Sequence, residues 1–120
     1  FVNQSRGETG YQHRIICQQD LSAVTAACMM VRKSVFDEVG GLTEELAVAF
    51  NDIDFCMKVR EAGYLIVYDP YAELYHYESK SRGLDQGNPE KVKRFQREMD
   101  IFQKRWPEIL RDGEALPYII

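Results

Sequence analysis

The stretch NDIDFCMKVREAGYLIVYDP, residues 51–70, decides the fold because it passes from a helical pattern to a strand pattern through one glycine. Asn51 is a residue type that caps helices, and Gly63 suits the left-handed turn that ends one. Residues 64–69 are rich in β-branched and aromatic side chains, which predicts a strand that ends at Pro70. A helix followed at once by a strand indicates an α/β arrangement.

The segment before this stretch is predicted to form another strand and another helix. Residues 21–31, LSAVTAACMMV, are largely small and apolar, a pattern typical of a strand covered on both faces. A buried helix would have a similar composition, but the β-branched residues favour a strand. Ser34 can then cap a short helix over residues 34–39, which Gly40 and Gly41 end.

The segment after it is predicted to end in a long amphipathic helix. Residues 73–77 alternate in polarity, as in a short strand or extended segment, and residues 78–88 form a polar loop. The sequence Asn88-Pro89 is a strong helix start, and the helix is predicted to run to about Arg105. Its apolar residues recur at spacings of three and four, which predicts one packed stripe: Val92, Phe95, Met99, Phe102 and Trp106.

These elements divide the chain into three segments. Residues 1–20 are an irregular leading segment, residues 21–88 hold the acidic and histidine motifs, and residues 89–120 are a packing helix and tail. The strands are too few to complete a parallel sheet, so we predict an α/β fold with a few-stranded mixed sheet and packed helices that is incomplete on its own. Apolar surface left open in such a fragment predicts self-association by dimerisation or strand exchange.

Composition narrows the function classes. The net charge is −4 with a sequence pI of about 5.2, which argues against general affinity for nucleic acid. No apolar run approaches the length of about 20 residues that a transmembrane helix needs. The three cysteines have no metal-type spacing and form no disulfide framework, as in a protein of a reducing compartment.

Asp52 and Asp54 lie in the first turn of the helix predicted from Asn51. A general base that takes a proton from a sugar hydroxyl needs a fixed carboxylate facing a cleft, and a helix start can hold one. Acids in a first turn are also ordinary partners of the helix dipole. The pair is formally an Asp-x-Asp metal triplet as well. A glycosidase pair is disfavoured, because two acids two residues apart in one turn point in different directions.

Two further sites have chemistry that the residues alone leave open. His76, between two tyrosines, is either a nitrogen ligand for a divalent metal or a half-buried histidine of the core. Arg82 follows Ser81 in a glycine-containing loop, where its guanidinium can bind phosphate or simply be solvated.

Two longer runs together carry a family resemblance. They are SAVTAACMMVRKSVFDEVGGLTEE, residues 22–45, and AFNDIDFCMKVREAGYLIVYDPYAELYHYESKSRG, residues 49–83. Over about residues 20–83 their order and spacing resemble the C-terminal, acceptor-side half of family-two inverting glycosyltransferases, in the bacterial rhamnosyltransferase-like and cell-surface polysaccharide branch. The resemblance implies the C-terminal portion of a GT-A fold.

The resemblance also implies a role for each candidate residue. Asp52 stands at the position of the base that deprotonates the acceptor. The other implied roles are acceptor binding by Thr25, Ala26 and Asn51, metal binding by His76, and closure over the diphosphate by Ser81 and Arg82. The chain departs from the family pattern in two places. It has Asn51-Asp52 where the family usually has Glu-Asp, and alanines at 26 and 27 where a glycine is common.

The resemblance further predicts partners, cofactor and location. The partners would be a nucleotide diphosphate sugar and a glycan or lipid-linked acceptor, and the cofactor would be Mn or Mg, held mostly by an N-terminal half. We expect the chain to be inactive alone and to lie in the cytoplasm, or at the inner face of the membrane. The alternative is a non-catalytic glycan- or protein-binding module derived from such an enzyme.

Overall fold

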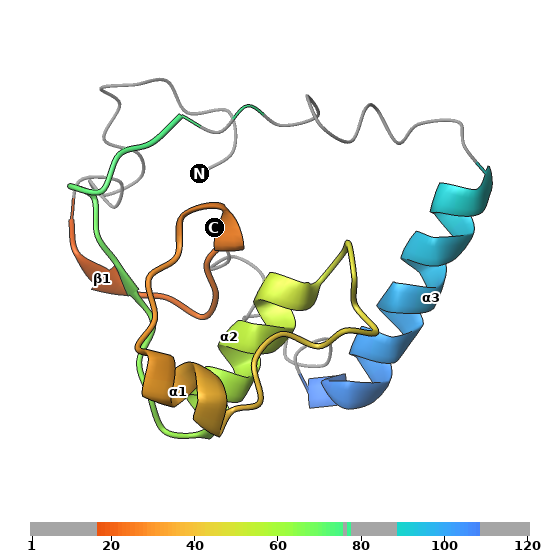
Figure 1. The fold of residues 1–120 in the computed structure, drawn as a ribbon, viewed down its shortest axis with the longest axis horizontal. Coiled ribbons are helices and arrows are strands. Elements are labelled where there is room, and N and C mark those ends of the chain that lie inside the picture. Colours follow the sequence, from red (N-terminus) through yellow and green to blue (C-terminus); the bar gives the residue numbers. More distant parts are fainter. Residues whose placement is uncertain (1–16, 76, 78–88, 109–120) are drawn as a thin grey trace.

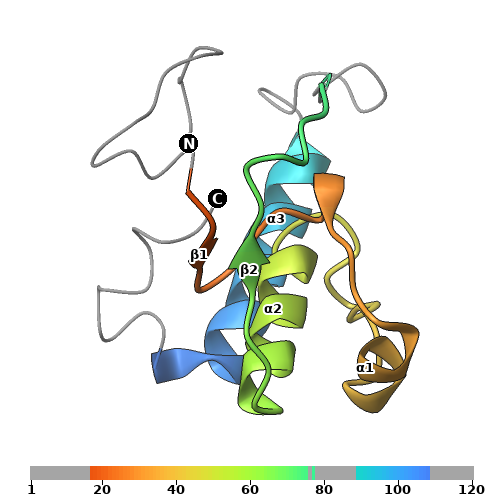
Figure 2. The same cartoon turned by 90° about the vertical axis from the view of Figure 1, so that its left-hand side faces the viewer.

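The computed structural model describes residues 17–75, 77 and 89–108, and the statements below concern these residues. Their elements follow in the order β1 (Gln19–Asp20), the 3₁₀ helix η2 (Ala26–Cys28), α1 (Lys33–Glu38), α2 (Asn51–Glu61), β2 (Val67–Tyr68) and α3 (Pro89–Arg105). Figures 1 and 2 show α2 between α1 and α3. This is a small mixed α/β arrangement, as predicted.

The sheet of the described residues consists of β1 and β2. The two strands pair antiparallel, with Gln19 opposite Tyr68 and Asp20 opposite Val67. One more backbone bond, from Leu21 N to Ile66 O at 2.8 Å, extends the pairing. Of the strand predicted over residues 64–69, only Val67–Tyr68 forms a strand, and residues 72–75 belong to no strand.

The strand predicted over residues 21–31 is wrong. The chain turns through η2 instead, and the Thr25 hydroxyl accepts a hydrogen bond of 3.3 Å from Ala27 N. Such a local side-chain bond competes with a strand ladder. Met30 is fully exposed, so the segment is not covered on both faces. Thr25 and Ala26 consequently lie at a turn rather than on a strand.

The core forms around α2. One cluster joins Cys56 and Met57 to Ala23, and a second joins Phe55 and Val59 to Val35 of α1. Because α2 packs against neighbours on several sides, its buried residues are almost continuous rather than confined to one stripe.

Glycine and proline correctly predict where helices begin and end, whereas the polar residues predicted as N-caps do not. Gly40, Gly41 and Gly63 all have positive φ, at 83°, 68° and 94°, and α3 begins at Pro89 as predicted. Ser34, however, lies inside α1, which begins one residue earlier at Lys33 and has no side-chain cap.

The cap predicted for α2 is also wrong, because Asn51 is the first residue of the helix itself. The N-cap is Phe50, whose φ of 63° places it in the left-handed region. An aromatic residue is rare in this conformation. Ring contacts with Phe95 and Phe102 of α3 hold it there.

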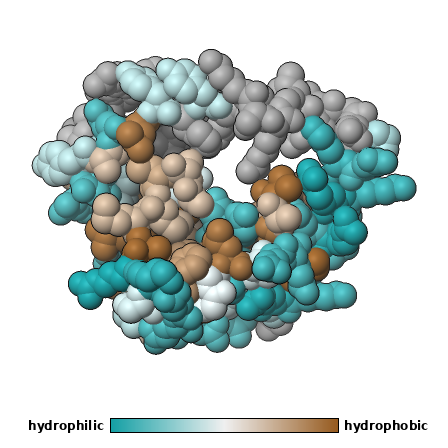
Figure 3. Space-filling view, in the orientation of Figure 1, coloured by the Kyte–Doolittle hydropathy of each residue, from teal (hydrophilic) through white to brown (hydrophobic). Residues whose placement is uncertain are grey.

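The apolar stripe of α3 is buried at only one end within the described residues. Phe102 is buried, whereas Phe95 is 47% and Val92 59% exposed. Figure 3 shows the outer side of α3 as mostly hydrophilic. Other large apolar side chains that the structure leaves exposed include Met30, Leu65, Val67 and Leu74. None of the described helices is long and apolar enough to cross a membrane.

Candidate active site

Asp52 is the second residue of α2, and its carboxylate is partly exposed. The first N–H groups of a helix lack intrahelical partners, and Asp52 Oδ1 accepts one of them, from Ile53 N at 2.9 Å. Oδ2 accepts from Ala26 N at 3.3 Å. A carboxylate has about four lone-pair sites. These two bonds therefore orient the group and still leave it able to accept a proton.

The structure brings three of the predicted site residues together. Ala26 donates its N–H to Asp52, and Thr25 caps the same turn through its bond from Ala27 N. The turn is exposed, so a hydroxyl compound can reach it. Asn51 is next to Asp52 in the chain, half-buried at the start of α2.

Cys56 lies one turn further along α2 and contacts the residues just before this turn, at Val24. Its Sγ is 3.5 Å from both Val24 N and Val24 O. Burial raises the pKa of the Cys56 thiol, with a smaller contribution from the charge of Asp52. Asp52 and Cys56 together therefore fix the segment that leads into η2 against one face of α2.

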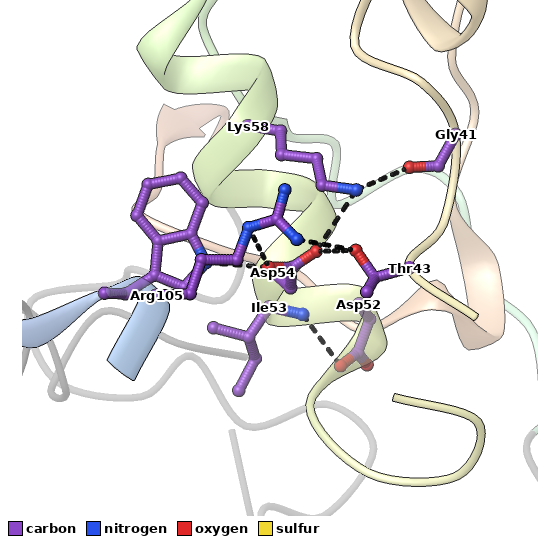
Figure 4. A network of polar contacts seen from close by, with 8 residues as sticks. Gly41, Thr43, Asp52, Ile53, Asp54, Lys58 and Arg105 are labelled. Atoms are coloured by element: carbon purple, nitrogen blue, oxygen red, sulfur yellow. Dashed lines mark hydrogen bonds and ion pairs between the residues drawn. The ribbon is translucent and has the colours of Figure 1, made fainter. Parts of the chain in front are cut away.

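Asp54 has an entirely different environment (Figure 4). It is fully buried, and its carboxylate accepts hydrogen bonds from Thr43 Oγ1 at 2.6 Å and Trp106 Nε1 at 2.7 Å. Lys58 Nζ lies 3.3 Å from Oδ2, and Arg105 Nε lies 3.4 Å from Oδ1. Burial raises the pKa of Asp54, but the hydrogen bonds and the two cations lower it by more. The pKa therefore lies below its ordinary value of 3.8.

The two aspartates thus lie in different environments. Figure 4 shows Asp52 pointing away from the network around Asp54. All the oxygens of Asp54 are engaged by protein donors, so it is unsuited to be a second catalytic carboxylate or a metal ligand. Of the two, only Asp52 has a partly exposed carboxylate.

The remaining predicted residues lie outside the described part of the chain. These are His76, Ser81 and Arg82, so their roles stay predictions. Among the residues that the structure describes, no group of three or more His, Cys, Asp or Glu side chains could hold a metal ion. The described residues therefore supply no metal centre, and the predicted metal depends on His76 and on groups elsewhere.

Sequence reasoning missed Glu98, which is buried at 2% exposure on α3. Its carboxylate accepts from Val48 N at 3.2 Å and from Ala49 N at 2.8 Å. A signal was present, because Glu98 is spaced three residues from Phe95 and four from Phe102. A glutamate on the apolar face of a helix needs a partner.

Comparison with known proteins supports a glycosyltransferase family. The chain is 37% identical over 62 residues to N-acetylglucosaminyl-diphospho-decaprenol L-rhamnosyltransferase of Mycobacterium tuberculosis. The alignment covers 52% of the chain and 20% of that protein. It is 33% identical over 63 residues to O-antigen biosynthesis protein RfbC of Myxococcus xanthus, covering 52% of the chain and 5% of that protein.

A longer match carries no functional name. The chain is 56% identical over 98 residues to uncharacterized protein y4gI of Sinorhizobium fredii, which covers 81% of the chain and 11% of that protein. The chain thus spans at most 20% of the length of these relatives. No family model and no solved structure matches it.

Proposed function

We propose that this chain is the acceptor-side part of an inverting glycosyltransferase, in which Asp52 is the general base. The observation that carries the proposal is the contrast between the two aspartates of α2. Asp54 is buried and fully engaged, whereas Asp52 is accessible and oriented by Ala26 N and Ile53 N. A general base must be fixed in direction and open to the group it deprotonates.

The chemistry proposed for Asp52 is one proton transfer. Its carboxylate takes the proton of the acceptor hydroxyl as that oxygen attacks the anomeric carbon of the donor sugar. The bond from this carbon to the diphosphate breaks on the opposite face, and the nucleoside diphosphate leaves with the bonding electrons. The exposed turn at Thr25 and Ala26, with Asn51 beside it, would receive the acceptor.

The remaining parts of the proposal concern the rest of the protein. The donor would be a nucleotide diphosphate sugar, and the acceptor a glycan or lipid-linked sugar of bacterial cell-surface polysaccharide. Ser81 and Arg82 are proposed to bind the diphosphate. The donor set for Mn or Mg would be completed outside the described residues. We propose that the chain works within a longer cytoplasmic or membrane-associated enzyme of GT-A fold and is inactive alone.

The test is Asp52→Asn in the full-length protein, with transfer of labelled sugar as the assay. Loss of a general base lowers kcat by about 10²- to 10⁴-fold, while binding of the nucleotide is retained. Asp37→Asn is the matched control, because Asp37 is an exposed carboxylate of α1 that pairs with Lys33. Normal turnover by Asp52→Asn would refute the assignment.

The same assay addresses the rival function. A glycan- or protein-binding module would bind the acceptor without turnover in the wild-type protein, and Asp52→Asn would then have no activity to lose.

A further inference from the structure

One face of α3 contacts three consecutive residues that lead into the proposed base. The residues on α3 are Phe95, Glu98 and Phe102, spaced by three and four, so they share one side of the helix. Glu98 accepts from the N–H groups of residues 48 and 49, and the two rings contact Phe50. Asp52 follows two residues later. We call this set of contacts the α3 clamp.

Glu98 is the polar part of the α3 clamp. At 2% exposure it is a buried carboxylate, which is costly unless it is hydrogen-bonded. Each of its oxygens accepts one backbone N–H, from Val48 at 3.2 Å and from Ala49 at 2.8 Å. A two-point contact of this kind fixes both the position and the direction of the chain just before α2.

Phe50 is the aromatic part of the α3 clamp. Its ring centroid lies 5.3 Å from those of both Phe95 and Phe102, and it is stacked on the latter. Its φ of 63° is left-handed, a conformation that costs a residue with a side chain free energy and persists where the surroundings enforce it. The ring contacts and the Glu98 bonds are such surroundings. They determine the angle at which α2 starts.

The chain is held by α3 beyond the base as well. Asp54 accepts from Trp106 Nε1 at 2.7 Å and pairs with Arg105 Nε at 3.4 Å. The chain around Asp52 is thus fixed on both sides by α3 and by Trp106, which follows it, while the Asp52 carboxylate accepts a hydrogen bond from Ala26 N.

We propose that Glu98 is a positioning residue for the transfer reaction, acting through the left-handed Phe50 to aim the carboxylate of Asp52. This inference rests on the proposed function, because it presumes that Asp52 is the base. It differs from a purely structural role in one respect. Loss of Glu98 should impair the chemical step more than an equal loss of stability caused by a substitution in α2 away from the α3 clamp.

The experiment compares Glu98→Gln with Val59→Ala in the full-length enzyme. A glutamine has one oxygen to accept one N–H and places its NH₂ against the other, which releases one contact. Val59 is buried near the far end of α2, so its truncation destabilises the helix without touching the α3 clamp. The measurements are kcat, donor and acceptor KM, melting temperature, and hydrogen exchange of a peptide covering residues 47–54.

For Glu98→Gln we expect kcat to fall roughly 10- to 100-fold, since small misplacement of a reacting group has effects of this size. Donor KM should stay unchanged, and the 47–54 peptide should exchange faster. Val59→Ala should keep kcat within about twofold of wild type, because only interactions made in the transition state alter kcat. If Glu98→Gln does not fold, Phe95→Ala tests the same contacts from a side chain that is 47% exposed, with a several-fold fall in kcat expected.

Two outcomes would overturn the inference in distinguishable ways. If Asp52→Asn is inactive but kcat falls no more in Glu98→Gln, or in Phe95→Ala, than in Val59→Ala, the positioning role is wrong and the proposed function stands. If Asp52→Asn turns over normally, the proposed function fails and the positioning role fails with it.

Discussion

Replacing Asp54 with asparagine would remove the buried charge that joins α2 to α3 while keeping the shape of the side chain. The amide oxygen can still accept from Trp106 Nε1, and the Thr43 hydroxyl can reverse to accept from the amide NH₂. What is lost is the negative charge opposite Lys58 and Arg105. The substitution therefore isolates the electrostatic part of the network.

The exposed fraction of each cation's side chain decides which of the two ion pairs contributes more to stability. The Arg105 side chain is 44% exposed, so water screens its pairing with Asp54, whereas the Lys58 side chain is only 10% exposed. Removing one partner of a buried pair costs about 3–5 kcal/mol. Lys58 keeps its 3.0 Å bond to Gly41 O, so we expect the lower end, about 3 kcal/mol. For a chain of this size that is a fall in melting temperature of about 10 °C.

Asp37→Asn is the matched control for this prediction. Asp37 and Lys33 form the same type of pair, four residues apart in a helix, and at 2.7 Å it is shorter than the pair of Asp54 and Lys58 at 3.3 Å. Its side chains are 83% and 57% exposed, so its loss should cost no more than about 0.5 kcal/mol. The comparison separates burial from distance as the source of stability.

The assay is urea unfolding of the 120-residue chain, followed by fluorescence of Trp106 and by circular dichroism. Trp106 is the single tryptophan of the chain, and its indole contacts Asp54 directly. If Asp54→Asn loses no more stability than Asp37→Asn, the buried network does not hold α2 to α3 and the reasoning is refuted.

The pH dependence of the same difference has a definite sign. The pKa of Asp54 is lowered in the folded chain from its ordinary value of 3.8, so the unfolded chain takes up the proton first as the solution is acidified. The stability contributed by Asp54 is fully present above about pH 3.8 and is lost as the pH falls through the lower, folded pKa. Unfolding curves of wild type and Asp54→Asn should therefore converge in acid.

Two further predictions concern the glycine turn and the cysteines. Gly41→Ala should destabilise the protein by roughly 2–4 kcal/mol, and Gly40→Ala by only about 1–2 kcal/mol. Both glycines have positive φ, but only at Gly41 would a Cβ meet an aromatic ring, at 2.9 Å. Thermal melts that show equal losses of stability for the two variants would contradict this. In the folded chain, iodoacetamide should modify the exposed thiols of Cys17 and Cys28 well before the buried Cys56, because burial raises the pKa of the Cys56 thiol. The rates can be compared by mass spectrometry of tryptic peptides. If Cys56 reacts as fast as Cys17 and Cys28, the prediction is wrong.

Backbone chemistry that is local to the sequence was predictable. Gly63 and the pair Gly40-Gly41 end helices because few other residues accept a positive φ, and Pro89 begins α3 because its missing N–H needs no partner there. The segment over residues 21–31 was not predictable in this way. A strand propensity is satisfied only when a partner strand lies alongside, and a turn capped by a hydroxyl is a competing arrangement.

The left-handed Phe50 could not be predicted from its neighbours. Aromatic residues avoid positive φ in isolation, so this conformation depends on contacts with α3, about 50 residues away in the chain. Glu98 reaches residues 48 and 49 across separations of 50 and 49 positions. Local sequence rules place the helix cap at Asn51, one residue too late, because they take no account of contacts between residues distant in the chain.

Which of the two aspartates is buried also depends on contacts between residues distant in the chain, but helix geometry leaves almost only two possibilities. Residues two apart in an α-helix are separated by about 200° around its axis, so Asp52 and Asp54 face almost opposite sides of α2. Trp106 ends the apolar stripe of α3, and its indole N–H requires an acceptor when α3 packs on α2. Whichever aspartate meets that indole is withdrawn from solvent, and the other is left facing the turn at Ala26. The packing of α3 on α2 thus buries Asp54 and, by the same rotation, leaves the carboxylate of Asp52 partly exposed, as the proposed role of a general base requires.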